Sequence, residues 1–199
     1  YTSGINITYA NEEEIYQVLT VVQSRLNENI IAHLHSIVFY GAGCGNVEKA
    51  NYLKKIIYSF FPIANIQVYS DLLGACHALC DTSSGWVGIL GTGSASCLYD
   101  GDKMFLTTPS PGYLLGDEGS GTYLGKIFLK SYLMKLLPPQ VCQRFENKFN
   151  LTPSLVLEKL YRQPQPNRFI SSLAPFLMEE IDEPYIREIC HQNFDDFIK

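Results

Sequence analysis

The sequence has little basic charge, and that charge is scattered along the chain. Fifteen lysine and arginine residues stand against twenty acidic residues, which gives a net charge of −5. The longest basic block is Lys54-Lys55. A surface that binds nucleic acid needs a concentrated basic patch. We therefore expect no nucleic acid among the partners of this protein.

Long apolar runs and paired cysteines are also missing. No apolar run reaches the roughly 18 residues of a membrane-spanning helix, so we expect no membrane span and no membrane partner. The six cysteines are scattered without a CxxC pair, which favours reduced, buried thiols and a cytoplasmic location. The Walker A pattern Gly-x-x-x-x-Gly-Lys-Ser/Thr is absent as well, which excludes the common strand–loop–helix phosphate site.

What the sequence does contain is an alternation of helical and strand patterns over residues 1–107. Apolar spacing predicts helices near residues 15–26, 47–60 and 72–79, and a capping box at Asn11 and Glu14 begins the first. Strands are expected at 36–40, 66–69 and 86–90, the last of them buried. This order is typical of an α/β layer with a partly parallel sheet. Residues 108–199 are mostly helical, with a first helix over about 122–137, so we place a domain boundary near residue 108.

Glycine-rich or acidic stretches follow the expected strands at residues 41–45, 71 and 91–94. The carboxyl ends of strands are where such sheets collect ligands. Gly91-Thr92-Gly93-Ser94 in particular turns tightly, and consecutive amide groups on such a turn form a nest for anionic oxygens. Strands are expected to return over 96–99 and 103–107, with Asp100-Gly101 as a hairpin turn between them. The alternative for residues 91–94 is an ordinary tight hairpin.

Carboxylates stand out at two places. Asp71 lies between a strand and a helix, where it could be an N-cap or a base that takes a proton from a substrate hydroxyl. Asp117 and Glu118 lie among glycines in Gly116-Asp117-Glu118-Gly119-Ser120-Gly121, directly before a helix. One acid there could cap the helix, but two acids suit hydrogen bonds to sugar hydroxyls or to an amide. His33-Leu34-His35 has no third ligand nearby, and Cys76 and Cys80, one helical turn apart with His77 between them, are more typical of a helix face of small residues than of a metal site. We therefore predict no metal held by protein side chains.

Three segments in this order resemble the N-acetylglucosamine kinases. They are Ser70-Asp71-Leu72-Leu73-Gly74-Ala75, then residues 88–94, then residues 112–121. These kinases belong to the BadF/BadG/BcrA/BcrD ATPase-type group of the actin/hexokinase/Hsp70 superfamily, and the likeness is greatest to Bacteroides-type members. The resemblance covers about residues 1–137. It implies a ribonuclease H-like fold of two lobes that close on the sugar, the second lobe being more helical.

The resemblance also implies a function and site residues. The expected reaction is phosphorylation of an amino sugar, N-acetylglucosamine at its 6-hydroxyl, by ATP with Mg²⁺. Asp71 matches the catalytic base. The second phosphate loop matches Gly91, Thr92 and Gly93, with Thr92 at the ATP phosphates. Positions that match the sugar site are Asn6, Ser94, Ala95, Gly112, Asp117 and Glu118. A homodimer is a further expectation.

Two family segments have no match in the sequence. The first phosphate loop, of the Asp-Gly-Gly-Gly-Thr type, is absent before Tyr1, and the late adenosine motif is absent beyond Lys199. The chain also begins Tyr1-Thr2-Ser3-Gly4 without a Met, so we expect it to be part of a longer protein. Two other functions stay open: an ATPase activator of a dehydratase, and a sugar-binding relative without activity. The activators carry a cysteine that binds an iron–sulfur cluster, and the corresponding residues 116–121 of this sequence contain no cysteine.

Overall fold

The structure, a computed structural model, describes residue 2 and residues 4–199; Tyr1 and Ser3 lie outside the described residues. It contains two compact units. The first holds the chain up to Val87 together with Leu98–Phe105, and the second holds Gly88–Cys97 and Leu106–Lys199. A domain boundary near residue 108 stays a prediction. Among the described residues, no helix is both long enough and apolar enough to cross a membrane.

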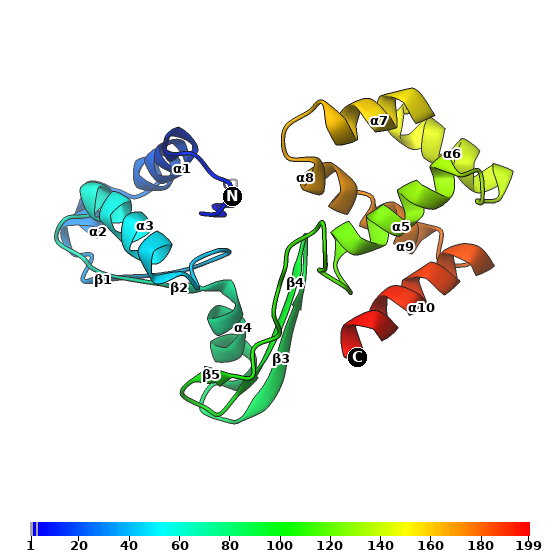
Figure 1. Cartoon of the computed structure of the whole chain (residues 1–199). Helices are drawn as coiled ribbons and strands as arrows, with labels where there is room; N and C mark the ends of the chain where they lie inside the picture. Colours follow the sequence, from blue (N-terminus) through cyan, green and yellow to red (C-terminus); the bar gives the residue numbers. More distant parts are fainter. Residues whose placement is uncertain (1, 3) are drawn as a thin grey trace. The chain divides into compact units, whose positions relative to one another are not determined.

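The first unit is built on a parallel pair of strands with helices packed against it (Figure 1). Its elements in chain order are α1 (Glu12–Ser24), α2 (Glu28–Ala32), β1 (Ser36–Gly41), α3 (Val47–Phe60), β2 (Asn65–Ser70) and α4 (Asp71–Cys80). Gly41, the last residue of β1, pairs with Ser70, the last residue of β2. The turns after both strands therefore leave the same edge of the sheet. The predicted α/β class is confirmed.

Local signals in the sequence explain where these helices begin. The Asn11 side chain accepts a hydrogen bond from the Glu14 amide at 2.8 Å, and the Glu14 carboxylate accepts one from the Asn11 amide at 3.0 Å. This is the predicted capping box. The apolar faces of α1 and α3 then bury the core of the unit with β2. The buried side chains of this core are Ile7, Ile15, Leu19, Cys44, Leu53, Ile56, Ile57, Phe61, Ala64 and Ile66.

A separate three-stranded sheet contains β3 (Gly85–Leu90), β4 (Ser94–Tyr99) and β5 (Met104–Phe105), in that order. The expectation that residues 91–94 end a strand of the same sheet as β1 and β2 is therefore wrong. The reason is that β3 pairs with the strand that follows it across a three-residue turn, and apolar content does not reveal a strand's partner.

Two further predictions about these strands need correction. The β3 strand is not buried, since Trp86 is 70% exposed and only Val87 lies in the interior. A run of apolar residues cannot show whether a second layer covers the strand. The expected strand over 103–107 is shorter, because Leu106 adopts a left-handed φ of 49° and ends it.

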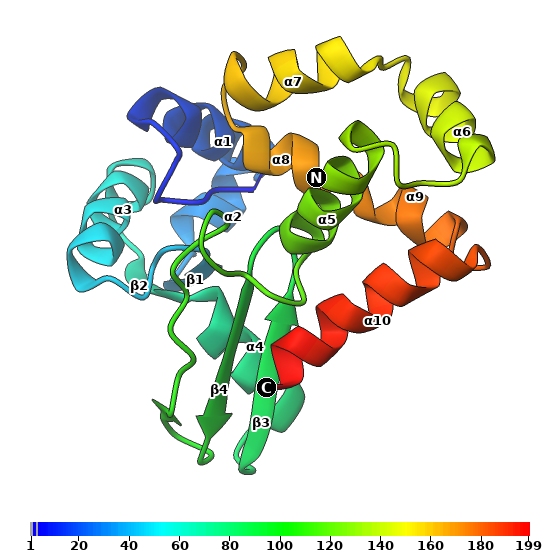
Figure 2. The same cartoon turned by 45° about the vertical axis from the view of Figure 1, so that its right-hand side comes forward.

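The second unit is mainly helical (Figure 2). It contains α5 (Gly121–Leu133), α6 (Pro139–Phe149), α7 (Pro153–Tyr161), α8 (Pro166–Ser171), α9 (Ala174–Glu179) and α10 (Pro184–Ile198). Proline occupies the first turn of the last five, where its missing amide hydrogen has no helical partner to lose. The predicted helix ending near residue 137 stops at Leu133, because Lys135 has a φ of 57°.

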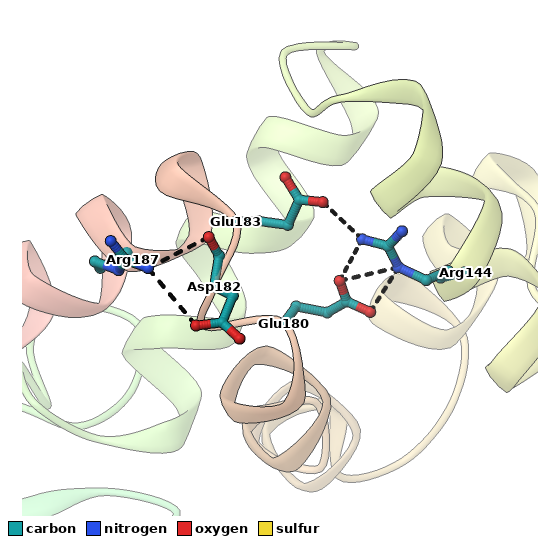
Figure 3. A network of polar contacts seen from close by, with 5 residues as sticks. All are labelled: Arg144, Glu180, Asp182, Glu183 and Arg187. Atoms are coloured by element: carbon teal, nitrogen blue, oxygen red, sulfur yellow. Dashed lines mark hydrogen bonds and ion pairs between the residues drawn. The ribbon is translucent and has the colours of Figure 1, made fainter.

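Helix α5 lies at the centre of this unit and packs against α8, α9 and α10. Its apolar face includes Phe128, whose ring packs edge-on against Phe145 and Phe176. On the surface, Arg144 of α6 bonds Glu180 through Nε at 2.8 Å and Glu183 through Nη2 at 2.9 Å (Figure 3). Helix α9 is therefore held to α5 by buried aromatic rings, and Arg144 joins α6 to the segment between α9 and α10 by ion pairs.

Candidate functional site

The turn between β3 and β4 is bonded directly to the start of α5. The Gly121 amide donates to the Gly91 carbonyl at 2.9 Å, and the Thr122 amide donates to the Thr92 carbonyl at 3.3 Å. The Thr122 hydroxyl also donates to the Thr92 carbonyl. These bonds fix the orientation of two successive peptide groups in the turn.

The same bonds determine where the amide groups of the turn point. In a trans peptide the N–H lies opposite the C=O, and the described residues contain no cis peptide. Because the carbonyls of Gly91 and Thr92 face α5, the amide hydrogens of Thr92 and Gly93 face away from it. Within the described part of the chain neither amide has a hydrogen-bond acceptor. Thr92 is exposed and Gly93 is half-buried, so these two donors are available to an anion.

Asp117 is held in an unusual position between the glycines. Its residue is 8% exposed and its φ is 65°, in the left-handed region. The Ser110 hydroxyl donates to Asp117 Oδ1 at 3.1 Å, and the Asp117 carbonyl accepts from the Ser120 amide at 3.0 Å. The N-cap of α5 is Ser120, whose hydroxyl accepts from the Tyr123 amide at 3.0 Å. The alternative in which an acid caps this helix is therefore wrong.

The turn at residues 91–93 is in direct contact with residues 116–121, which we call the acidic loop. A Cβ placed on Gly93 would lie 2.9 Å from Asp117 Oδ2, and real Cβ atoms essentially never come that close to another atom. Only glycine at this position therefore leaves the Asp117 carboxylate where it is. This contact joins two sequence motifs, the turn that contains Gly93 and the loop that contains Asp117, 24 residues later in the chain.

A pocket of about 110 Å³ opens beside Asp117. It is lined by hydroxyl groups, acids and a few apolar side chains. The lining residues are Ser94, Ala95, Ser96, Thr108, Pro109, Ser110, Asp117, Glu118, Asp196, Phe197 and Lys199. Four of the residues expected at the sugar, namely Ser94, Ala95, Asp117 and Glu118, are therefore brought together in the second unit. Gly112 lies outside this lining, at a φ of 84° in the turn before the loop.

Asp71 and Asn6 belong to the first unit. Ser70 rather than Asp71 is the N-cap of α4, since its hydroxyl accepts from the Leu73 amide at 3.2 Å. The N-cap interpretation of Asp71 is thus wrong. Asp71 is half-buried in the first turn, where Oδ1 accepts from the Leu72 amide at 3.0 Å. Burial, and then the nearby Asp71 charge, raise the pKa of the Cys44 thiol in the turn after β1.

The segment that carries Asn6 is joined to that same turn. The Ile7 amide donates to the Ala42 carbonyl at 3.2 Å. Gly43 packs so closely that a Cβ on it would lie 2.4 Å from the Thr8 hydroxyl. The Asn6 side chain accepts from the Thr8 amide at 3.0 Å, which orders the start of this segment.

Comparison with known proteins identifies a similar solved structure. No protein-family model matches the chain, and no curated protein matches it. Among solved structures, the chain is similar to the crystal structure of the "putative N-acetylglucosamine kinase" of Porphyromonas gingivalis. The two are 38% identical over 99% of this chain and 70% of that one, with a TM-score of 0.92. This chain belongs to the N-acetylglucosamine kinase family.

Two groups of residues beside the acidic loop were missed from the sequence. One is Lys126 of α5, whose ammonium group donates to the carbonyls of Tyr113 and Gly116. Burial lowers the pKa of Lys126, against the opposing effect of Asp117 and Glu118. The other group comes from the end of α10, which lines the pocket with Asp196 and Phe197. No local pattern marks either group, because both lie in ordinary amphipathic helices.

The residues present fit a nucleotide phosphate better than a metal cage. The exposed turn offers the amides of Thr92 and Gly93 and the Thr92 hydroxyl, all of them donors to anionic oxygens. The described residues contain no group of three or more His, Cys, Asp or Glu side chains that could hold a metal ion. Mg²⁺ in nucleotide sites commonly keeps its waters and binds phosphate oxygens with only one or two carboxylates, so a phosphate held by this turn would itself supply oxygen ligands for Mg²⁺.

Proposed function

We propose that this protein transfers a phosphoryl group from ATP to an amino sugar, N-acetylglucosamine at its 6-hydroxyl. The observation that carries the proposal is the contact between Gly93 and Asp117, which joins a turn suited to phosphate to a buried carboxylate suited to sugar hydroxyls. The printed name of the Porphyromonas gingivalis relative supports the same reaction class. We further propose that the protein has the actin/hexokinase fold and is a Bacteroides-type member of the BadF/BadG/BcrA/BcrD ATPase-type group. The cytoplasmic location, expected from the unpaired cysteines, and the homodimer stay predictions.

The sugar is proposed to bind through the carboxylates of the acidic loop. Asp117 keeps acceptor capacity beyond its one bond from Ser110, and Glu118 lines the same pocket. Charge-assisted hydrogen bonds contribute about 1.5–3 kcal/mol each. Ser94 and Ala95 border the same pocket. The pocket has a volume of about 110 Å³, below the roughly 300 Å³ at which ligand pockets begin. Asn6 and Gly112 are further residues proposed to contact the sugar.

The phosphate groups of ATP are proposed to bind the turn at Gly91, Thr92 and Gly93. Bound Mg²⁺ would neutralise charge on the phosphate oxygens. Within this chain, the amides of Thr92 and Gly93 would orient the phosphates, and their bonded carbonyls at α5 would keep the turn rigid. Phosphoryl transfer relies mainly on such positioning and electrostatic stabilisation.

Asp71 is the proposed base. As the sugar 6-oxygen bonds to the γ-phosphorus, the bond from that phosphorus to the ADP oxygen breaks and the hydroxyl proton passes to the Asp71 carboxylate. Two observations support this role. Ser70 already caps α4, so an acid is not needed at residue 71 for the helix to begin, and the side chain is only half-buried.

The test is a coupled assay for ADP release by the full-length protein with a panel of sugars. We expect release with N-acetylglucosamine, and a loss of about 10²–10⁴-fold in kcat for Asp71→Asn, the usual size of a general-base contribution. The variant should fold normally because Ser70 retains the cap. ADP release that no sugar stimulates contradicts the proposed function. Retention of more than about a third of wild-type kcat by Asp71→Asn contradicts the base.

A further inference from the structure

A buried asparagine on α10 is bonded to the acidic loop, although its helix contributes nothing to the three motifs. Asn193 is 1% exposed. Its Oδ1 accepts from the Gly119 amide at 2.8 Å, in a bond that is itself buried. Gly119 follows Asp117 and Glu118 directly. A polar side chain costs free energy when it is buried without a partner. The hydrogen bond from the Gly119 amide offsets this cost for the Asn193 carbonyl oxygen.

The Gly119 amide needs this partner as much as Asn193 does. Gly119 has a φ of 82° and lies just before the N-cap of α5. A Cβ on it would lie 2.8 Å from the Cβ of Phe197 and 2.9 Å from Leu90 Cδ2. The loop therefore passes between α10 and β3 with no space for a side chain. An amide buried there without an acceptor would favour a different loop conformation.

The end of α10 makes a second, independent bond to the base of the loop. Tyr123, in the first turn of α5, donates its hydroxyl to Asp196 Oδ2 at 3.2 Å. Asp196 and Phe197 also line the pocket beside Asp117 and Glu118. The last turn and a half of α10 therefore bonds both the acidic loop and the first turn of α5, and it also lines the pocket beside the loop.

We infer that Asn193 is a positioning residue for sugar binding, which rests on the proposed function. By fixing the Gly119 amide, Asn193 sets the left-handed course of the loop and so the orientation of the two carboxylates. Its loss should change the affinity for the sugar acceptor far more than the affinity for ATP. No bond joins Asn193 to the turn at residues 91–93 among the described residues.

The experiment compares Asn193→Leu and Asn193→Asp in the full-length protein, by titration with N-acetylglucosamine and with ATP and by hydrogen exchange at the Gly119 amide. Leucine is apolar and accepts nothing, whereas aspartate keeps an acceptor oxygen at the same reach. Tyr185→Phe is the matched control, since it removes a 3.1 Å bond to the Ser131 hydroxyl at the other end of α10.

We expect Asn193→Leu to weaken sugar binding roughly 5- to 100-fold, the range for one unsatisfied buried donor, with ATP binding unchanged. The Gly119 amide should exchange faster in this variant. Asn193→Asp should restore most of both properties, and Tyr185→Phe should leave both unchanged. If Asn193→Leu does not fold, Asn193→Asp must still protect the Gly119 amide as wild type does.

Two results overturn the inference and can be told apart. Wild-type protein that binds sugar, with an Asn193→Leu variant that binds it equally well, contradicts the positioning role alone. Wild-type protein that binds no sugar at all contradicts the proposed function, and the positioning role with it. Equal losses of sugar and ATP affinity, matched by Tyr185→Phe, would reduce Asn193 to a stabilising residue of α10 and so also contradict the inference.

Discussion

The contact between Gly93 and Asp117 predicts that a single added methyl group disables the proposed sugar site. In Gly93→Ala the new Cβ would lie 2.9 Å from Asp117 Oδ2 and 3.2 Å from its Cγ. Asp117 is buried and has a short side chain, so it cannot swing aside cheaply. Adding a methyl to a packed site costs about 1–3 kcal/mol. Moving the carboxylate would relieve the contact and would also disturb the bond that it accepts from Ser110.

The same turn provides the control. A Cβ on Gly91 would meet nothing closer than the Gly93 carbonyl oxygen at 3.9 Å, which is ordinary contact. Neither glycine has a positive φ, so alanine strains the backbone at neither position. Comparing the two variants therefore separates the clash with Asp117 from the general effect of replacing a glycine in the turn.

The assay is calorimetric titration with N-acetylglucosamine, together with thermal unfolding of each variant. Displacing Asp117 removes at least one charge-assisted bond of about 1.5–3 kcal/mol, so Gly93→Ala should raise the Kd for the sugar by roughly 10- to 100-fold. Gly91→Ala should bind sugar nearly as wild type does. A Gly93→Ala variant with wild-type sugar affinity, or an equal loss in Gly91→Ala, would refute the reasoning.

Two other substitutions test the elements on either side of this contact. Thr92→Val removes a hydroxyl donor without changing the size of the side chain. Titration should therefore show a larger loss of affinity for ATP than for the sugar, relative to wild type; a larger loss for the sugar would mean that the turn faces the sugar. Lys126→Met removes the donor to the carbonyls of Tyr113 and Gly116 and should weaken sugar binding several-fold, by about the 0.5–1.5 kcal/mol of one net hydrogen bond. The exposed Lys130 on the same helix is its control, and equal effects of Lys126→Met and Lys130→Met would show that only the charge matters.

Much of the fold follows from local signals in the sequence. The capping box at Asn11 was predicted and is observed, and the helix starts at Pro153 and Pro184 carry the same kind of local signal. Each depends on residues within one helical turn of one another, so the sequence alone is enough to reveal it. The short helix α2 (Glu28–Ala32) was missed, because five residues are too few for an apolar period to be seen.

The parts that could not be predicted depend on partners distant in the chain. The separate sheet of β3 results from pairing, which apolar content does not encode. The pocket residues Ser94, Ala95, Asp117 and Glu118 were expected from their motifs, and the structure gathers them. Asn193 was not expected, because its role arises only when α10 packs beside Gly119, 74 residues earlier in the chain.

The most direct measurement is titration of wild type, Asp117→Ala and the double variant Asp117→Ala/Glu118→Ala with N-acetylglucosamine and with ATP, in the full-length protein. Losing two charge-assisted bonds should weaken sugar binding roughly 10²–10⁴-fold. We therefore expect no measurable sugar binding in Asp117→Ala and near-normal ATP binding in both variants. The double variant excludes compensation by Glu118. Unchanged sugar affinity in the double variant would reduce residues 116–121 to the start of a helix and contradict the sugar kinase assignment.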